Sequence, residues 1–257
     1  MSVVPRRSLG QHFLVDENIL HVIARLADLR ADDVVLEVGP GLGILTRYLA
    51  ARVRLVHAVE IDRSLAVPLG EALKGLENVA LRFGDALRLD LGALEPPPLK
   101  LVANLPYSIA TPLVVESFDR VPSLERWCVM VQREVADRFF AVPRTKAYGA
   151  VSVLVQLRAR KVGLHAVSPT VFRPRPRVDS ALVAFVRSGS APSRDVRSLV
   201  EAAFAHRRKT LANSVSLVGL LPRERAERAL AVIGRPPNAR AEELEAEEFV
   251  ALAEALR

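Results

Sequence analysis

The fold can be predicted from one short segment of the chain, which reads Glu37-Val38-Gly39-Pro40-Gly41-Leu42-Gly43. It ends an apolar, strand-like run at residues 34–38 and precedes a helix predicted at 45–51. Its glycines permit a tight turn and let a ligand approach bare backbone, and the amides that open the helix then face that ligand. The segment therefore predicts a strand, a turn and a helix, with a ligand site at the turn.

The same alternation continues along the chain. Further buried strands are predicted at residues 55–59, 79–83, 99–103 and 127–131, and a helix is predicted at 65–73. Short apolar strands that alternate with helices imply a parallel sheet covered on both faces. Two more strand-like runs, at 162–167 and 181–186, flank a segment rich in proline and arginine and are expected to form an antiparallel pair at the sheet edge. The prediction is an α/β fold with a seven-stranded sheet.

The chain is expected to divide into two domains. Helices are also predicted after Asp16, which can cap one, and at 133–141 and 150–157. From about Ser188 onward the pattern is only helical, and Ser188–Ser193 has the composition of a linker. We therefore expect a ligand-binding domain at 1–188 and a small all-α domain at 189–257.

Composition excludes several classes of protein. The 257 residues carry a net charge of +7, which favours a polyanionic partner, and nucleic acid is the commonest of these. The single cysteine, Cys128, allows no intrachain disulfide, so a reducing cytoplasm is expected. No apolar stretch of about 18 residues occurs, and no apolar signal core follows Arg6-Arg7, so no membrane segment is expected. No metal site is predicted.

Glycine spacing distinguishes between two kinds of nucleotide ligand. A dinucleotide-binding turn has the pattern Gly-x-Gly-x-x-Gly, but its third glycine position holds Ile44 when counted from Gly39 and Thr46 when counted from Gly41. The spacing thus argues against a nicotinamide oxidoreductase. The observed Gly-x-Gly-x-Gly resembles the first motif of class I methyltransferases, which implies S-adenosyl-L-methionine as the cofactor.

Acidic residues stand at the ends of the next two strands. Glu60 ends the second strand and can accept hydrogen bonds from both hydroxyls of a ribose. Gly84-Asp85-Ala86 follows the third strand, and its carboxylate can accept from the amine of the cofactor's adenine. Either acid alone could be a solvated strand end. Because ligands of open α/β sheets bind at the carboxyl ends of the strands, we expect both acids to converge with the glycine turn.

The fourth strand is followed by Asn104-Leu105-Pro106-Tyr107, which resembles the (Asn/Asp)-x-Pro-Tyr motif of methyltransferases that act on amino groups of nucleobases. An adenine amine is a poor nucleophile because its lone pair is delocalised into the ring. The side-chain carbonyl of Asn104 and the backbone carbonyl of Pro106 can accept its two N–H bonds and draw the nitrogen toward tetrahedral geometry. Tyr107 can stack on a base that is flipped out or single-stranded. The same residue types also occur in ordinary turns.

Three further segments extend the resemblance to nearly the whole chain. They are Gly10-Gln11-His12-Phe13-Leu14, Val171-Phe172-Arg173-Pro174-Arg175-Pro176-Arg177-Val178-Asp179-Ser180 and His206-Arg207-Arg208-Lys209-Thr210-Leu211-Ala212-Asn213-Ser214. With the motifs above, they are similar to those of the ribosomal RNA adenine dimethyltransferases, and the third is typical of the small-subunit enzymes. The resemblance implies a class I methyltransferase Rossmann-like fold. It also implies dimethylation of N6 in two adjacent adenines of the 3′-terminal hairpin loop of 16S rRNA, during small-subunit biogenesis.

The resemblance also implies roles for individual residues. Cofactor contacts are expected from His12, Leu14, Gly39, Gly41, Gly43, Glu60, Ile61, Asp85, Ala86 and Asn104. Target-base contacts are expected from Asn104, Leu105, Pro106, Tyr107 and Phe172. In this scheme Phe172 stacks on the target adenine opposite Tyr107, although a phenylalanine beside a strand is by default a core residue.

Basic residues concentrate beside the predicted base site. Residues 158–187 hold seven basic side chains against one acid, whereas 188–257 are nearly balanced, at eleven against ten. Contacts to RNA phosphates, which set affinity and register, are expected from Arg173, Arg175, Arg177, Arg207, Arg208 and Lys209. The implied partner is 16S rRNA within the small ribosomal subunit or its precursor. The chain is expected to act on it as a monomer in the cytoplasm.

Two alternatives stay open. The first keeps the enzyme class but changes the substrate to large-subunit rRNA or to DNA adenine, and the segment Arg207-Arg208-Lys209-Thr210 argues against it. The second is a non-catalytic nucleic-acid-binding or assembly factor on the same fold, as some mitochondrial transcription factors related to the family are. The intact Asn104, Pro106 and Tyr107 argue against this, but they do not exclude a second role in ribosome assembly.

Overall fold

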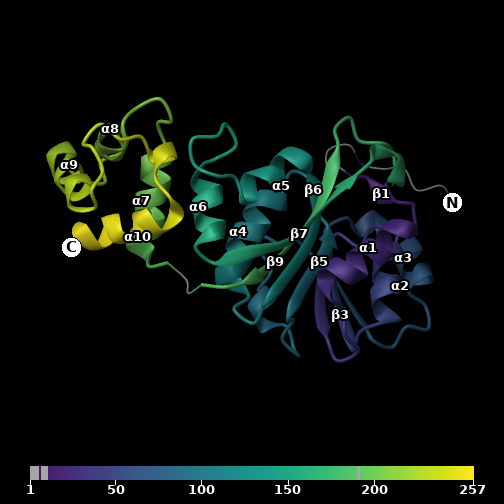
Figure 1. Cartoon of the computed structure of the whole chain (residues 1–257). Helices are drawn as coiled ribbons and strands as arrows, with labels where there is room; N and C mark the ends of the chain where they lie inside the picture. Colours follow the sequence, from purple (N-terminus) through teal and green to yellow (C-terminus); the bar gives the residue numbers. More distant parts are fainter. Residues whose placement is uncertain (1–5, 7–10, 190–191) are drawn as a thin grey trace. The chain divides into compact units, whose positions relative to one another are not determined.

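A computed structural model describes residues 6, 11–189 and 192–257 of the chain (Figure 1). Gly10 of the N-terminal motif and residues 190–191 of the expected linker lie outside these residues. The chain groups into two compact units. Unit 1 consists of Met1–Ala136 and Arg160–Arg187, and unit 2 of Asp137–Ala159 and Ser188–Arg257.

Unit 1 contains a seven-stranded sheet with the strand order β4-β3-β2-β5-β6-β9-β7. Its strands are β2 (Val34–Val38), β3 (Leu55–Glu60), β4 (Val79–Phe83), β5 (Lys100–Asn104), β6 (Arg126–Gln132), β7 (Ala159–Val167) and β9 (Ser180–Arg187). The strands from β4 to β6 are parallel, and β9 runs antiparallel to β6. Figure 1 shows β5, β6, β9 and β7 side by side at this end of the sheet. The predicted α/β fold with a terminal antiparallel strand is confirmed.

Two helices cover one face of the sheet. They are α1 (Asn18–Ala27) and α2 (Ile44–Ala50). Their apolar sides join a core cluster that includes Ile23 from α1, Leu49 from α2 and Met130 from β6. Because side chains alternate along a strand, the residues on either side of Met130 point to the opposite face of the sheet. That face must also be covered by other elements.

The opposite face is covered by α4 (Ala110–Arg120), a helix that was not predicted from the sequence. Its Phe118 packs against Trp127 of β6, with 4.4 Å between the ring centroids. Trp127 in turn stacks on Phe185 of β9 at 5.3 Å. The remaining helical elements along unit 1 are η2 (Arg63–Leu65), α3 (Ala66–Ala72), η3 (Leu91–Ala93), α5 (Arg133–Phe139, which ends in unit 2) and η4 (Pro169–Val171). Among the described residues, no helix has the length and apolar character needed to cross a membrane.

A separate two-stranded sheet joins distant parts of unit 1. Strand β1 (Phe13–Leu14) pairs antiparallel with β8 (Phe172–Arg173), so that Leu14 lies opposite Phe172. The Val15 amide extends the pairing by donating to the Val171 carbonyl at 2.9 Å. The N-terminal motif is thereby fixed beside the segment rich in proline and arginine.

Unit 2 is helical. Its elements are α6 (Ala150–Gln156), α7 (Arg194–Phe204), α8 (Leu211–Leu217), α9 (Arg223–Val232), η5 (Ala241–Glu243) and α10 (Ala246–Ala255). Phe204 packs between Tyr148 and Phe249, and the Tyr148 hydroxyl donates to the Leu244 carbonyl at 2.7 Å. The sequence analysis placed 137–159 in the first domain. The structure groups this segment with the helices instead, because its buried side chains find their partners there.

Candidate active site

A cleft in unit 1 opens at the carboxyl ends of the parallel strands and encloses about 1030 Å³, part of which is open solvent. Most of the residues predicted for cofactor or base binding line it: His12, Leu14, Gly39, Gly41, Glu60, Ile61, Asp85, Ala86, Asn104, Leu105, Pro106 and Tyr107. The two predicted residues that are not among its lining residues are Gly43 and Phe172. The predicted convergence of successive strand ends is therefore present.

The turn after β2 depends on its glycines. Gly39, Gly41 and Gly43 have φ values of 77°, 58° and 79°, which favour residues without a Cβ. A Cβ on Gly41 would lie 3.0 Å from the ring of Phe13. Gly43 serves packing rather than the cleft, because its Cβ would lie 3.0 Å from a methyl carbon of Leu69. Its predicted cofactor contact is thus not supported by its position.

Glu60, at the end of β3, is organised by backbone amides. Its two carboxyl oxygens accept from the amides of Gly41 at 3.0 Å and of Asp62 at 2.9 Å. Burial raises the pKa of Glu60 above its usual value, although these hydrogen bonds act in the opposite direction. A carboxylate has about four lone-pair sites, so even with a further backbone bond from Ile61 the group can still accept from a ligand in the cleft.

Glu37 is a cleft residue to which the sequence analysis gave no role. Its side chain is only 1% exposed, and its Oε2 atom has no hydrogen-bond partner among the described residues. Burial raises the pKa of Glu37 to about 8; the Thr46 hydroxyl opposes this rise and the charge of Glu60 adds to it. The available signal was an acid inside an otherwise apolar strand, directly before the glycine turn. A carboxyl group with this pKa keeps its proton at neutral pH.

A polar network that the sequence analysis also missed ties the N-terminal segment to the end of β3. The Gln11 amide donates to Asp62 Oδ2 at 2.8 Å, and Arg6 lies 3.4 Å from the same carboxylate. Asp62 also accepts from the amide and hydroxyl of Ser64. Burial alone would raise the pKa of Asp62, but the bonds from Ser64 and Gln11 outweigh it and the pKa is lowered. The network holds one wall of the cleft.

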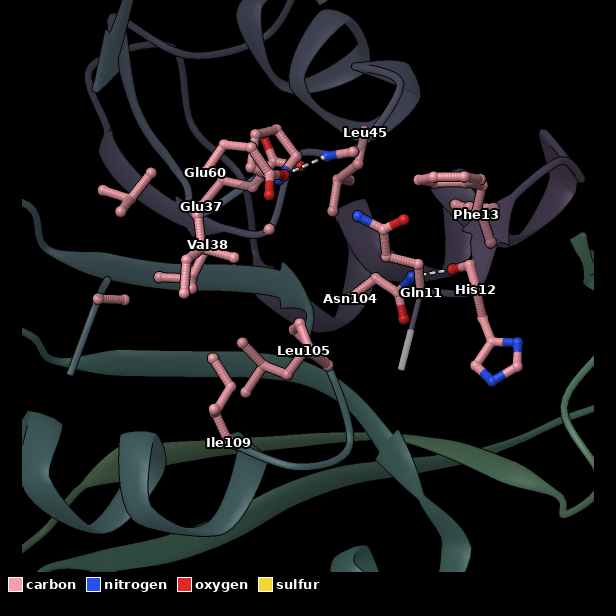
Figure 2. Close-up of a pocket in the computed structure, with 18 of the residues that line it drawn as sticks. Gln11, His12, Phe13, Glu37, Val38, Leu45, Glu60, Asn104, Leu105 and Ile109 are labelled. Carbon is pink, nitrogen blue, oxygen red and sulfur yellow. Dashed lines mark hydrogen bonds between the residues drawn. The ribbon is translucent and has the colours of Figure 1, made fainter. Parts of the chain in front are cut away.

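The fourth strand end carries an oriented acceptor. Figure 2 shows the Asn104 side chain between Leu105 and the 11–13 segment, with its amide nitrogen directed at the His12 carbonyl. That hydrogen bond is 3.0 Å long. Since the nitrogen is used in this way, the side-chain carbonyl oxygen of Asn104 is left as an acceptor within the cleft.

Tyr107 lies next to this acceptor. Its hydroxyl makes a 2.6 Å hydrogen bond with Ser180 Oγ, and its ring centroid is 5.5 Å from that of His12. Burial raises the pKa of Tyr107, opposed by the bond to Ser180. The ring position is therefore fixed from two sides.

Two predicted contacts to the base are corrected by the structure. The Pro106 carbonyl already accepts from the amides of Ile109 and Ala110, both at 3.1 Å, so it is not a free acceptor. Among the described residues, no backbone amide bonds the carbonyl of Leu105. Phe172 is 1% exposed and belongs to the core cluster, because β8 turns this side chain inward and Arg173 outward. In this conformation its ring is not open to stack on a base.

The predicted phosphate contacts fall into two sets. Arg173, Arg175 and Arg177 are exposed, and the His12 ring donates to the Pro174 carbonyl within the same segment at 2.7 Å. Arg207 is also exposed, and its guanidinium donates to the Lys146 carbonyl of unit 2 at 2.6 Å. The neighbouring side chains at 208–209 are exposed.

The chain is similar to known ribosomal RNA methyltransferases along nearly its whole length. The family model described as "Ribosomal RNA adenine dimethylase" matches residues 4–257. "Ribosomal RNA small subunit methyltransferase A" of Rubrobacter xylanophilus is 54% identical over 250 residues, which cover 96% of this chain and 94% of that protein. The protein of the same name from Lactiplantibacillus plantarum is 43% identical over 265 residues, covering 98% and 90%.

Solved structures show the same relationship. A dimethyladenosine transferase from Plasmodium falciparum superposes with a TM-score of 0.79 at 25% identity, covering 94% of this chain and 96% of that chain. The 23S rRNA methyltransferase ErmE superposes with a TM-score of 0.69 at 32% identity, covering 95% and 99%. On the strength of the family match along nearly its whole length, the chain belongs to the ribosomal RNA adenine dimethylase family.

Proposed function

We propose that this chain is an S-adenosyl-L-methionine-dependent methyltransferase that dimethylates N6 of two adjacent adenines in the 3′-terminal hairpin loop of 16S rRNA. The observation that carries the proposal is the orientation of Asn104. Its amide nitrogen is held by the His12 carbonyl, which leaves the side-chain oxygen as an acceptor inside a cleft lined by Glu60 and Asp85. An acceptor for an amine thus stands beside a site suited to a nucleoside.

The residues of the cleft fit this cofactor. The glycine turn offers bare backbone to a ligand in the cleft. In the proposal, Glu60 accepts from the ribose hydroxyls and Asp85 from the adenine amine. The methionine end is held by His12, Leu14, Gly39 and Asn104. When bound, S-adenosylmethionine supplies an electrophilic methyl group on a sulfonium sulfur.

The chain's own residues then position the target amine. Asn104 Oδ1 accepts one N–H of the adenine amine, and the Leu105 carbonyl takes the second in place of Pro106. These bonds orient the nitrogen lone pair, while Tyr107 stacks on the base. No strong general base is needed, because the alkylated amine is acidic enough to lose a proton to water. The rate comes from alignment and from acceptors placed where positive charge develops.

The choice of the small subunit rests on the relatives and on the C-terminal motif. The relatives over 40% identical described above carry the name of a small-subunit methyltransferase. The exposed residues Arg173, Arg175, Arg177, Arg207, Arg208 and Lys209 are the proposed phosphate contacts, and they give unit 2 a share in RNA binding. We place the chain at the small subunit or its precursor, as a monomer in the cytoplasm.

Mapping the modified bases tests the function. The protein is incubated with labelled S-adenosylmethionine and, in separate reactions, unmethylated small-subunit particles, naked 16S rRNA and 23S rRNA. We expect N6,N6-dimethyladenosine at two adjacent positions of the 3′-terminal loop in a small-subunit substrate, and modification slowed on the order of 100-fold or more with Asn104→Ala. Modification of 23S rRNA alone, or binding of small-subunit RNA without methyl transfer, would overturn the proposal in favour of a large-subunit enzyme or a binding factor.

A further inference from the structure

The loop after β4 carries the residues proposed to bind the adenine of the cofactor. Asp85 and Ala86 line the cleft there. The loop folds tightly around Asp85, whose Oδ1 accepts from the Leu87 amide at 2.9 Å. Its backbone carbonyl accepts from the amides of Arg88 and Leu89 at 2.9 and 2.8 Å. These bonds shape the loop but do not by themselves fix it against the rest of the sheet.

The loop is held from outside the cleft by the last residue of α4. Arg120 donates from Nη1 to the Ala86 carbonyl at 3.1 Å and from Nη2 to the Leu89 carbonyl at 2.5 Å. Glu116, one turn earlier, lies 3.4 Å from the same guanidinium. Arg120 is not among the residues that line the cleft, and its side chain is 26% exposed. A planar, charged donor thus bridges two carbonyls of the loop that carries Asp85.

Close packing also places the chain that follows the loop directly against the end of α4. A Cβ on Gly92 would lie 2.6 Å from the Arg120 carbonyl oxygen, and one on Gly84 would lie 2.8 Å from the Leu89 side chain. The contact at Gly92 is with backbone and leaves no room for a side chain, whereas the contact at Gly84 is with a side chain of the same loop. The backbone at Gly92 thus lies against the end of α4, three residues after the Leu89 carbonyl that Arg120 bonds.

The other end of α4 begins at the target-base motif. The helix begins at Ala110, and the amides of Ile109 and Ala110 both donate to the Pro106 carbonyl. Phe118 and the other buried residues of α4 anchor the helix on the sheet. A helix of 11 residues, about 16 Å long, thus connects the Asn104 motif with the loop that carries Asp85.

We propose that Arg120 is a positioning residue. It holds the loop that carries Asp85, which is proposed to bind the adenine of the donor, in place relative to the Asn104 motif. This inference rests on the proposed function. Arg120 touches neither ligand; it acts through the Ala86 and Leu89 carbonyls on the direction of the Asp85 carboxylate. Its loss should therefore reduce recognition of the 6-amino group of the donor's adenine more than it reduces binding of the rest of the molecule.

The test measures selectivity for that amino group. Calorimetry compares the dissociation constants of S-adenosylhomocysteine and of S-inosylhomocysteine, in which oxygen replaces the amine. Because the ratio is taken on one protein preparation, any unfolded fraction cancels. The wild type should prefer the adenosyl compound by about 10-fold or more, as expected for a lost hydrogen bond to a charged group. In Arg120→Gln we expect the ratio to fall below about 3-fold, with Arg120→Lys, which keeps the charge but not the two-armed geometry, in between.

Arg126→Gln is the matched control. Its guanidinium also donates to a backbone carbonyl, that of Leu26, and lies 3.5 Å from Asp28 with the side chain 22% exposed, but the residue is not part of the cleft. This variant should keep the wild-type ratio. An unchanged ratio in both Arg120 variants, or a wild type that does not discriminate, would overturn the inference while leaving the RNA assay to judge the function. A wild type that binds neither compound would overturn both.

Discussion

The two halves of the cleft are built in different ways. The nucleoside-binding part of the donor half comes from one continuous stretch, 37–86, in which the glycine turn, Glu60 and Asp85 follow successive parallel strands. The target half is assembled from three distant segments, joined by the bond from Asn104 to His12 and by that from His12 to Pro174. Sequence-local motifs suffice for the first half, whereas the second depends on long-range contacts. The two halves should therefore respond differently to substitution.

The largest difference is expected at Asn104. Asn104→Ala removes the acceptor for the target amine, so turnover should fall on the order of 100-fold or more. The dissociation constant of S-adenosylhomocysteine should rise by less than about 10-fold. Asn104→Asp keeps an acceptor but cannot donate to the His12 carbonyl, and it should retain more turnover than the alanine variant. Single-turnover methyl transfer and calorimetry give the two quantities.

A control separates this effect from a general loss of fold. Asn78 donates to the carbonyls of Ala50 and Val53 and does not line the cleft. Asn78→Ala should leave turnover per folded molecule unchanged. If Asn104→Ala instead weakened cofactor binding as much as turnover, the separation into two halves would be wrong.

Glu37 provides a test in the donor half, through its effect on how stability depends on pH. Burial raises the pKa of Glu37 to about 8 from a usual value of 4.5. The native state thus keeps a proton that the unfolded chain releases, and this group lowers stability as pH rises from about 4.5 to about 8. Glu37→Gln removes the dependence, so between about pH 5 and pH 8 the variant should gain on the order of 1 kcal/mol or more relative to the wild type.

Urea unfolding at the two pH values measures this gain. Glu77→Gln, at an exposed position, is the control and should follow the wild type. Parallel stability curves for the wild type and Glu37→Gln would show that Glu37 ionises normally in the native protein.

Phe172 tests the corrected assignment in the target half. As a core residue it should lose about 1 kcal/mol of stability in Phe172→Leu, with turnover within about 2-fold of the wild type. Tyr107→Leu removes a base-stacking contact, so its kcat/KM should fall by an amount equivalent to about 1–3 kcal/mol. Thermal unfolding and steady-state kinetics distinguish the two variants. A loss of kcat/KM in Phe172→Leu as large as that in Tyr107→Leu would restore the stacking role.

The smallest effect is expected at the exposed arginines beside the target half. Arg173→Ala, Arg175→Ala and Arg177→Ala together should reduce the slope of log affinity for RNA against log salt by about 2, since each lost phosphate contact contributes about 0.7–0.9. A triple substitution of the exposed arginines at 47, 54 and 82 removes the same charge elsewhere on unit 1 and should change the slope less. An unchanged slope in the first triple variant would rule this segment out.

The donor half could be predicted because its signals are local. Val34–Val38 is a strand as predicted, and Glu60 and Asp85 lie where the ends of parallel strands must lie. Glycine spacing also identified the turn. The spacing did not show that Gly43 faces Leu69 rather than the cleft. The spacing of glycines in a turn does not reveal which helix packs against that turn.

The target half and the domain division depended on contacts that no local pattern encodes. A strand of two residues, such as Phe172–Arg173, has no alternation from which to tell the buried side from the exposed one. The bonds that occupy the Pro106 carbonyl arise only because α4 begins four residues later. In the same way, 137–159 groups with the C-terminal helices because Tyr148 reaches Phe204 and Leu244, which are far away in sequence.

A crystal structure with S-adenosylhomocysteine tests most directly whether the two halves form one site. The nucleoside should lie in the cleft with its ribose at Glu60 and its adenine at Asp85, and its sulfur should face the Asn104 carboxamide. A nucleoside bound elsewhere, or an Asn104 side chain turned away from the sulfur, would contradict the account.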